Sequence, residues 1–156
     1  IHTVYGGGPP EPYTFLGQIH TALAADQTFH MTPGTQLREY HHVDDIARAI
    51  HEASRANIRG VIDLSHAQPL SLKQLAEAIF IGCHKPHLLS VGALPTPAND
   101  NFDKIYTKSP YVGDHRPVIQ GVLAYMNTVL SADSTRLNKR ETHNRSATTT
   151  LSIAQK

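Results

Sequence analysis

The sequence predicts an α/β protein whose parallel sheet is incomplete. Short β-prone segments alternate along the chain with segments whose apolar residues recur at helical spacing, and this alternation is typical of α/β folds. Only residues 1–5 and 61–64 have the composition of strands that could share one parallel sheet, and such a sheet needs several covered strands. The 156 residues include 37 Leu, Ile, Val or Phe, which is enough to form a core.

The first strand is predicted to end in a sharp turn. Residues 1–5 are β-prone, and three glycines at 6–8 followed by two prolines at 9–10 interrupt them. Glycines after a strand suggest a phosphate-binding loop, but this spacing matches no such motif. Proline also lacks the N–H group that would contact a phosphate. We therefore interpret the glycines as a turn.

Four segments are predicted to be helices. Apolar residues at helical spacing mark residues 13–25. A second helix begins just before Asp44 and Asp45, and we interpret both as helix-start acids because acids in a first turn are favoured by the helix dipole. Residues 71–74, Ser-Leu-Lys-Gln, form a capping-box pattern that starts a third helix. The last helix is expected over about residues 117–130.

The densest polar stretch lies between the first two helices. After a short predicted strand at 29–31, residues 37–41 are expected to be extended. In an extended segment Arg38 and Tyr40 share one face, and Glu39 and His41 share the other. A guanidinium can donate two parallel hydrogen bonds to a phosphate or carboxylate, which makes Arg38 a candidate binding residue. The alternative is a surface arginine paired with a nearby acid.

The chain is expected to divide into a folded part, residues 1–132, and a tail. Residues 133–156 are rich in Ser, Thr, Asn, Arg and Lys and contain few apolar side chains. This composition supports little packing, so we expect a disordered polar tail.

Composition excludes several classes of function. The formal net charge is +1 without a long basic run, which argues against nucleic-acid or membrane-surface binding, and no apolar stretch approaches 18 residues. The single cysteine excludes a disulfide scaffold. Cys83, His84 and His87 could contribute to a metal site, but no second cluster has matching spacing, so no metal site is assigned.

Several motifs in order resemble one enzyme family over about residues 1–80. The motifs are Thr3-Val4-Tyr5-Gly6, Gln36-Leu37-Arg38-Glu39-Tyr40-His41-His42-Val43-Asp44-Asp45, Gly60-Val61-Ile62-Asp63-Leu64-Ser65 and Ser71-Leu72-Lys73-Gln74-Leu75. Together they resemble the C-terminal half of an extended short-chain dehydrogenase/reductase, of the NAD-dependent epimerase/dehydratase family. The implied fold is an incomplete Rossmann-type fold, with the last strands and the small substrate-binding lobe.

The resemblance implies a nucleotide-sugar substrate for the complete enzyme. In the family, the arginine that matches Arg38 contacts the substrate's diphosphate. Thr3 stands where the family usually has an asparagine that also reaches the substrate, so Thr3 is a second candidate. The resemblance further implies NAD(P) as cofactor of the complete enzyme, a missing N-terminal Rossmann half, a possible homodimer and a cytoplasmic location.

The family's catalytic and cofactor motifs are absent from this sequence. None of the six tyrosines has a lysine four residues later, and no glycine-rich dinucleotide motif occurs. In this family a tyrosine assisted by lysine moves a proton while NAD moves a hydride. We therefore expect no catalytic residue and no bound cofactor in this chain alone. The alternative is a truncated, non-catalytic relative that acts as a binding or interaction module.

Overall fold

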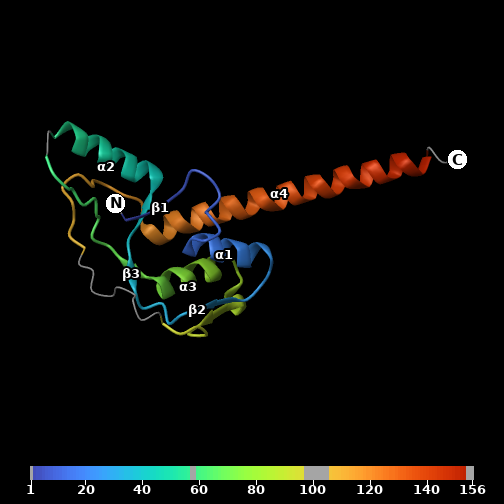
Figure 1. The fold of residues 1–156 in the computed structure, drawn as a ribbon, viewed down its shortest axis with the longest axis horizontal. Coiled ribbons are helices and arrows are strands. Elements are labelled where there is room, and N and C mark those ends of the chain that lie inside the picture. Colours follow the sequence, from blue (N-terminus) through green and yellow to red (C-terminus); the bar gives the residue numbers. More distant parts are fainter. Residues whose placement is uncertain (1, 57–58, 97–105, 154–156) are drawn as a thin grey trace.

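The computed structural model describes residues 2–56, 59–96 and 106–153, with side chains described up to position 136. It has a mixed α/β architecture (Figure 1), which confirms the predicted fold class. The strands are β1 (Thr3–Tyr5), β2 (Phe29–Met31), β3 (Leu37–Arg38), β4 (Tyr40–His42), β5 (Leu70–Ser71) and β6 (Leu89–Val91). The helices are α1 (Phe15–Ala24), α2 (Val43–Arg55), α3 (Leu72–Gly82) and α4 (Val118–Ile153), with a short 3₁₀ helix at Pro86–Leu88.

The strands form three separate two-stranded sheets. β1 pairs with β4 in parallel, so that Thr3 lies opposite Tyr40 and Tyr5 lies opposite His42. β2 pairs with β6 in parallel, and β3 pairs with β5 in antiparallel orientation. The predicted strand at 1–5 is therefore confirmed over Thr3–Tyr5, while Ile1 lies outside the described residues. β6 is not among the strands that the sequence predicts.

The main core lies where α1, α3 and α4 pack against one another (Figure 1). Its fully buried centre includes Ile19 from α1, Leu75 and Ile79 from α3, and Val122 and Met126 from α4. These residues recur at the i, i+3 or i+4 spacing that places side chains on one helical face. A smaller core beneath α2 contains the buried side chains of Ile46, Ala49, Leu64 and Val112.

Capping residues start the helices where the sequence predicts. The Thr14 side chain accepts a hydrogen bond from the Gly17 N–H group at the start of α1. Ser71 and Gln74 form the predicted capping box at the start of α3. Asp44 and Asp45 lie in the first turn of α2, which confirms their interpretation as helix-start acids.

The predicted strand at residues 61–64 is wrong. This segment has no regular secondary structure, and the Val61 side chain is fully exposed. Ile62 and Leu64 instead pack against α2 in the smaller core. The apolar residues of this segment therefore serve packing against a helix and not strand pairing. Among the described residues, β1 pairs with β4 and not with this segment.

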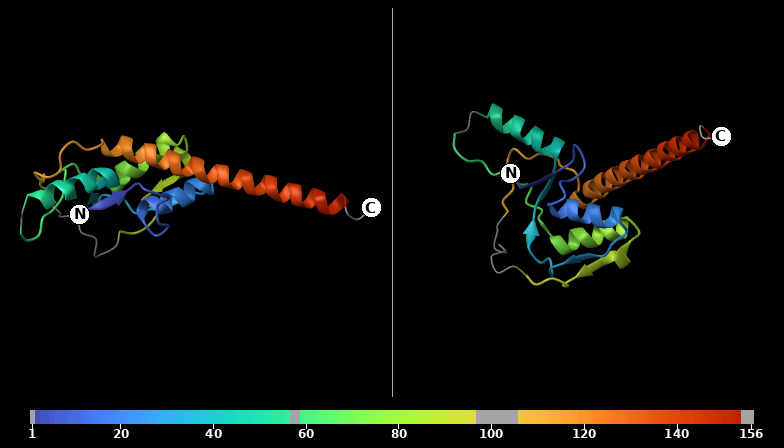
Figure 2. Two further views of the ribbon diagram at one scale, coloured as in Figure 1. Left: turned by 90° about the horizontal axis from the view of Figure 1, so that it is seen from above. Right: turned by 45° about the vertical axis from the view of Figure 1, so that its right-hand side comes forward.

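The last helix is much longer than predicted. We expected it to end near Leu130, but α4 continues to Ile153 and projects away from the rest of the chain (Figure 2). No glycine or proline follows Gly121, so no helix-terminating residue stops it. None of the described residues forms a helix that is long and apolar enough to cross a membrane.

Substitutions on α3 test the described packing. Ile79 is fully buried, whereas Ile81, two residues later on the same helix, is 63 % exposed. Ile79→Ala should lower the free energy of unfolding by about 2–5 kcal/mol, because it removes buried methyl groups and leaves a cavity. Ile81→Ala should change it by less than about 0.5 kcal/mol. Urea unfolding followed by circular dichroism measures both, and equal effects would contradict the packing of α3.

Candidate functional site

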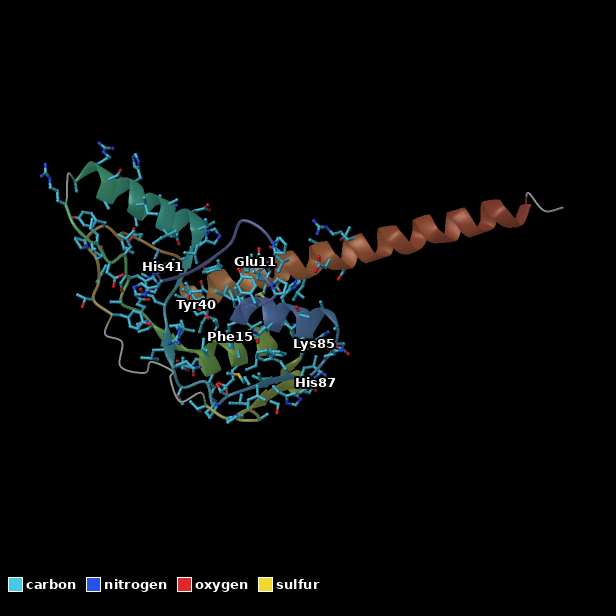
Figure 3. The ribbon with its side chains drawn as sticks, viewed as in Figure 1. Glu11, Phe15, Tyr40, His41, Lys85 and His87 are labelled. Atoms are coloured by element: carbon cyan, nitrogen blue, oxygen red, sulfur yellow. The ribbon has the colours of Figure 1, made fainter. Side chains whose placement is uncertain are left out.

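The β1–β4 ladder sorts its side chains onto two faces. In the parallel register Thr3 lies opposite Tyr40, and Arg38 precedes Tyr40 by two residues, so all three belong to one face. Glu39 and His41 lie on the other face, as the predicted alternation requires. In Figure 3, Tyr40 lies toward α1 and Phe15, whereas His41 lies nearer to α2.

A pocket of about 440 Å³ opens on the face that carries Arg38. It brings together the two residues that the sequence singled out as substrate contacts, Thr3 and Arg38. The other lining residues come from β1, the loop that follows it, the start of α1, β4, α3 and α4: Val4, Tyr5, Gly6, Pro9, Pro10, Glu11, Thr14, Phe15, Leu16, Tyr40, Leu72 and Tyr125. This volume is in the range of pockets that bind small molecules.

Positive charge and the start of a helix meet at this pocket. Arg38 is half-buried, and its guanidinium donates a 2.8 Å hydrogen bond to the carbonyl oxygen of Leu37. Phe15 and Leu16 begin α1 after the N-cap residue Thr14, and the helix dipole favours an anion at this end of a helix. The carboxylate of Glu11 is the one acidic side chain in the lining. The pocket therefore suits a ligand that carries an anionic group near Arg38.

Aromatic rings form much of the remaining wall. Tyr5, Tyr40, Phe15 and Tyr125 contribute, and the rings of Tyr5 and Tyr125 lie 5.7 Å apart. Burial, reinforced by Asp45 and opposed by Arg116, raises the pKa of Tyr5 to about 12. Burial also raises the pKa of Tyr40, although the charge of Arg38 opposes that increase. Both phenols are therefore neutral near pH 7, and both belong to the buried core behind the pocket wall.

The glycine run behaves as the predicted turn. Gly6 and Gly7 have φ angles of 109° and 82°, which side-chain-bearing residues rarely adopt. A Cβ atom on Gly6 would lie 3.0 Å from side-chain atoms of His42 and Val43. The Tyr125 hydroxyl donates a 2.7 Å hydrogen bond to the carbonyl oxygen of Gly8. The turn thus leads the chain out of β1. The hydrogen bond from Tyr125 of α4 fixes the end of the turn at Gly8 beside the pocket.

The opposite face of the ladder carries a buried polar cluster. The Glu39 side chain is fully buried, and its carboxylate lies 3.2 Å from His41 Nε2 and 2.9 Å from His66 Nδ1. It also accepts hydrogen bonds from the Ser65 hydroxyl at 3.0 Å and the Gln68 N–H group at 3.2 Å. Burial of a carboxylate is costly unless it is paired, and the Ser65 hydroxyl and the Gln68 N–H group supply hydrogen bonds to it.

Cys83, His84 and His87 do not form a metal-binding group among the described residues. The group of ligand atoms that lie within 4.8 Å of one another consists instead of Glu39, His41 and His66. Sequence reasoning placed Glu39 and His41 on one face but missed His66, because it lies 25 residues further along the chain than His41 without a spacing motif. It also missed Tyr125, whose role depends on how α4 packs.

A second cavity of about 710 Å³ runs along α2. Asp45, Arg48 and Glu52 line it from the helix, and residues 111–115 line it from the other side. Asp45 is already engaged there, because it accepts hydrogen bonds from the Arg48 guanidinium and from the Arg116 N–H group. No residue singled out as a binding candidate in the sequence lies in this cavity.

Comparison with solved structures identifies the fold. Over 86 % of its length the chain resembles a UDP-N-acetylglucosamine 4-epimerase from Methanobrevibacter ruminantium in complex with UDP-N-acetylmuramic acid, with a TM-score of 0.65 at 15 % identity. It resembles a UDP-glucose 4-epimerase from Thermotoga maritima with UDP-glucose over 81 %, with a TM-score of 0.64 at 17 % identity. It also resembles an NAD-dependent NDP-hexosamine 5,6-dehydratase involved in tunicamycin biosynthesis over 86 %, with a TM-score of 0.65 at 13 % identity.

These similarities cover only part of each enzyme. The chain spans 44 %, 43 % and 44 % of the three solved chains. No sequence-family profile and no curated protein matches it.

Substitution of Gly17 tests the close contact between α1 and the loop that lines the pocket. A Cβ atom at this position would lie 1.9 Å from the carbonyl oxygen of Glu11, which also accepts hydrogen bonds from the N–H and hydroxyl of Thr14. Gly17→Ala should therefore displace residues 9–11 and lower the free energy of unfolding by about 1–3 kcal/mol.

Gly113→Ala is the matched control, because its Cβ would meet no atom within 4 Å. It should change the free energy of unfolding by less than about 0.5 kcal/mol. Thermal denaturation of both variants measures the effect. A neutral Gly17→Ala would contradict the close contact between α1 and the loop.

The fold that the solved structures share with this chain is that of the nucleotide-sugar epimerases and dehydratases, and it spans less than half of each of those enzymes.

Proposed function

We propose that residues 1–132 form a nucleotide-sugar-binding part of an NAD-dependent epimerase or dehydratase. The observation that carries this proposal is the pocket that brings Thr3 and Arg38 together beside the N-terminus of α1. Sequence resemblance singled out both residues, and the fold similarity to epimerases and dehydratases supports the same assignment.

The pocket's chemistry matches the parts of a nucleotide sugar. A diphosphate can accept two parallel hydrogen bonds from the planar guanidinium of Arg38. Its negative charge also suits the N-terminal end of α1. The partly exposed aromatic residues of the lining, Phe15 and Tyr125, offer apolar surface for a base or sugar ring. The Thr3 hydroxyl, on the same face of the ladder as Tyr40, adds one further hydrogen-bonding group.

The proposed reaction chemistry resides outside these residues. NAD(P) and the proton-transferring tyrosine belong, in this proposal, to a dinucleotide-binding part of the complete enzyme. This chain contributes the binding and orientation of the substrate. A substrate held at its diphosphate presents its sugar ring in a defined position, and such positioning can lower a reaction barrier considerably.

Replacement of Arg38 tests the substrate contact. Loss of a hydrogen bond to a charged group costs about 1.5–3 kcal/mol, which corresponds to about a ten- to hundredfold loss in affinity. Arg38→Ala should therefore weaken binding of UDP-glucose by this factor, whereas Arg38→Lys should restore part of it, because an ammonium keeps the charge but lacks the planar fork.

The control for this experiment is Arg55→Ala, which removes an exposed arginine at the end of α2. Isothermal titration calorimetry measures the affinities, and circular dichroism checks that the variants are folded. Unchanged affinity in folded Arg38→Ala would remove Arg38 from the proposed site.

NAD binding provides an independent test of the division of roles. The chain lacks the glycine-rich turn that allows a backbone to approach a pyrophosphate. The 156-residue chain should therefore bind UDP-glucose without binding NAD at micromolar concentration. A titration of NADH monitored by its fluorescence measures this, and micromolar binding would contradict the proposal that the cofactor is held elsewhere.

A further inference from the structure

The buried cluster on the opposite face of β4 has the composition of a metal site. Glu39, His41 and His66 offer one carboxylate and two imidazoles, and their ligand atoms lie within 4.8 Å of one another. All three side chains are at most 1 % exposed. Two imidazoles and a carboxylate are a recurrent ligand set for zinc and for other divalent transition metals.

Hydrogen bonds determine which nitrogen of His66 carries a proton. His66 Nε2 lies 3.1 Å from the carbonyl oxygen of Tyr40, which can only accept, so Nε2 must donate. Nδ1 accepts a 3.1 Å hydrogen bond from the Gln68 N–H group. Nδ1 is therefore unprotonated, and the Gln68 N–H group donates both to it and to the Glu39 carboxylate, 2.9 Å away. A metal ion bound between these two acceptors would take the place of that shared N–H group.

Distances within the cluster fit a small coordination sphere. Zinc binds imidazole nitrogen and carboxylate oxygen at about 2.0–2.2 Å, so neighbouring ligand atoms around a tetrahedral ion lie about 3.3 Å apart. The carboxylate oxygens of Glu39 lie 2.9 Å from His66 Nδ1 and 3.2 Å from His41 Nε2. His2 Nε2 lies 3.5 Å from the same carboxylate and is the nearest further imidazole.

Outer contacts orient the ligands in the way that metal sites require. A metal-binding histidine usually donates its second ring N–H to a carboxylate or a backbone carbonyl, and His66 donates to Tyr40 in this manner. Ser65 and Gln68 donate to Glu39 Oε1 and hold the carboxylate in place. The two sides of the cluster, β4 and residues 65–68, are thereby fixed relative to each other.

We propose that Glu39, His41 and His66 bind one divalent transition-metal ion, with Zn²⁺ as the best-fitting ion and His2 as a fourth ligand. The ion would join β4 to residues 65–68 and to the residue just before β1. Asp63, whose side chain is 56 % exposed, lies 3.0 Å from His2 Nε2 and marks where the cluster meets the surface. This site lies on the opposite face of β4 from the nucleotide-sugar pocket and does not depend on the proposed function.

Zinc titration of the whole chain tests the proposal. After treatment with a chelator, the 156-residue chain should bind one Zn²⁺ per chain in calorimetry and unfold at a higher temperature with the metal than without it. Co²⁺ should give the intense visible absorption of a tetrahedral site. Loss of an outer-shell partner weakens metal affinity by about 10–100-fold. Glu39→Gln and His66→Gln each remove a ligand and should weaken Zn²⁺ binding by a larger factor. His2→Gln should weaken it less.

His51→Gln and His87→Gln are the matched controls, because both remove exposed histidines distant from the cluster, and both should leave Zn²⁺ affinity unchanged. Nitrogen-15 NMR of the wild-type imidazoles needs no variant: Zn²⁺ should shift His41 Nε2 and His66 Nδ1 and leave His51 and His87 unchanged. Absence of Zn²⁺ binding to the wild type would overturn the proposal. Binding that survives both Glu39→Gln and His66→Gln, or shifts confined to other histidines, would overturn it equally.

Discussion

The short parallel ladder between β1 and β4 is the constraint on which the rest of the structure depends. Three residue pairs set its register, and strand alternation then assigns every neighbouring side chain to one of two faces. One face contributes Thr3, Arg38 and Tyr40 to the pocket, and the other contributes Glu39 and His41 to the buried cluster. A shift of the register by one residue would exchange these faces and abolish both sites together.

A buried carboxylate determines the path of the chain after the smaller core. Glu39 requires partners inside the protein, and residues 65–68 supply a hydroxyl and a backbone N–H. To deliver them the loop turns tightly, and Ala67 adopts a φ angle of 59°, which is unfavourable for a residue with a Cβ atom. The electrostatic requirement of one side chain thus outweighs local backbone preference in this loop.

The sequence predicted correctly those features that depend on interactions between residues close together in the chain. The capping box at Ser71, the acids at the start of α2 and the alternation across Arg38–His41 all act within a few residues, and the structure confirms each of them. The apolar run at 61–64 was misjudged because a strand and a segment packed on a helix have the same composition. The contacts of His66 and Tyr125 bridge distant segments, so no local pattern announced them.

The hydrogen bond from Tyr125 to Gly8 gives the pocket a mechanical connection to the longest helix. Tyr125 lies near the start of α4, whose 36 residues extend over about 54 Å at 1.5 Å per residue. The loop after β1, which lines the pocket, is therefore tied to the base of this helix. Any displacement of the carbonyl group of Gly8 breaks this hydrogen bond or moves the base of the helix with it.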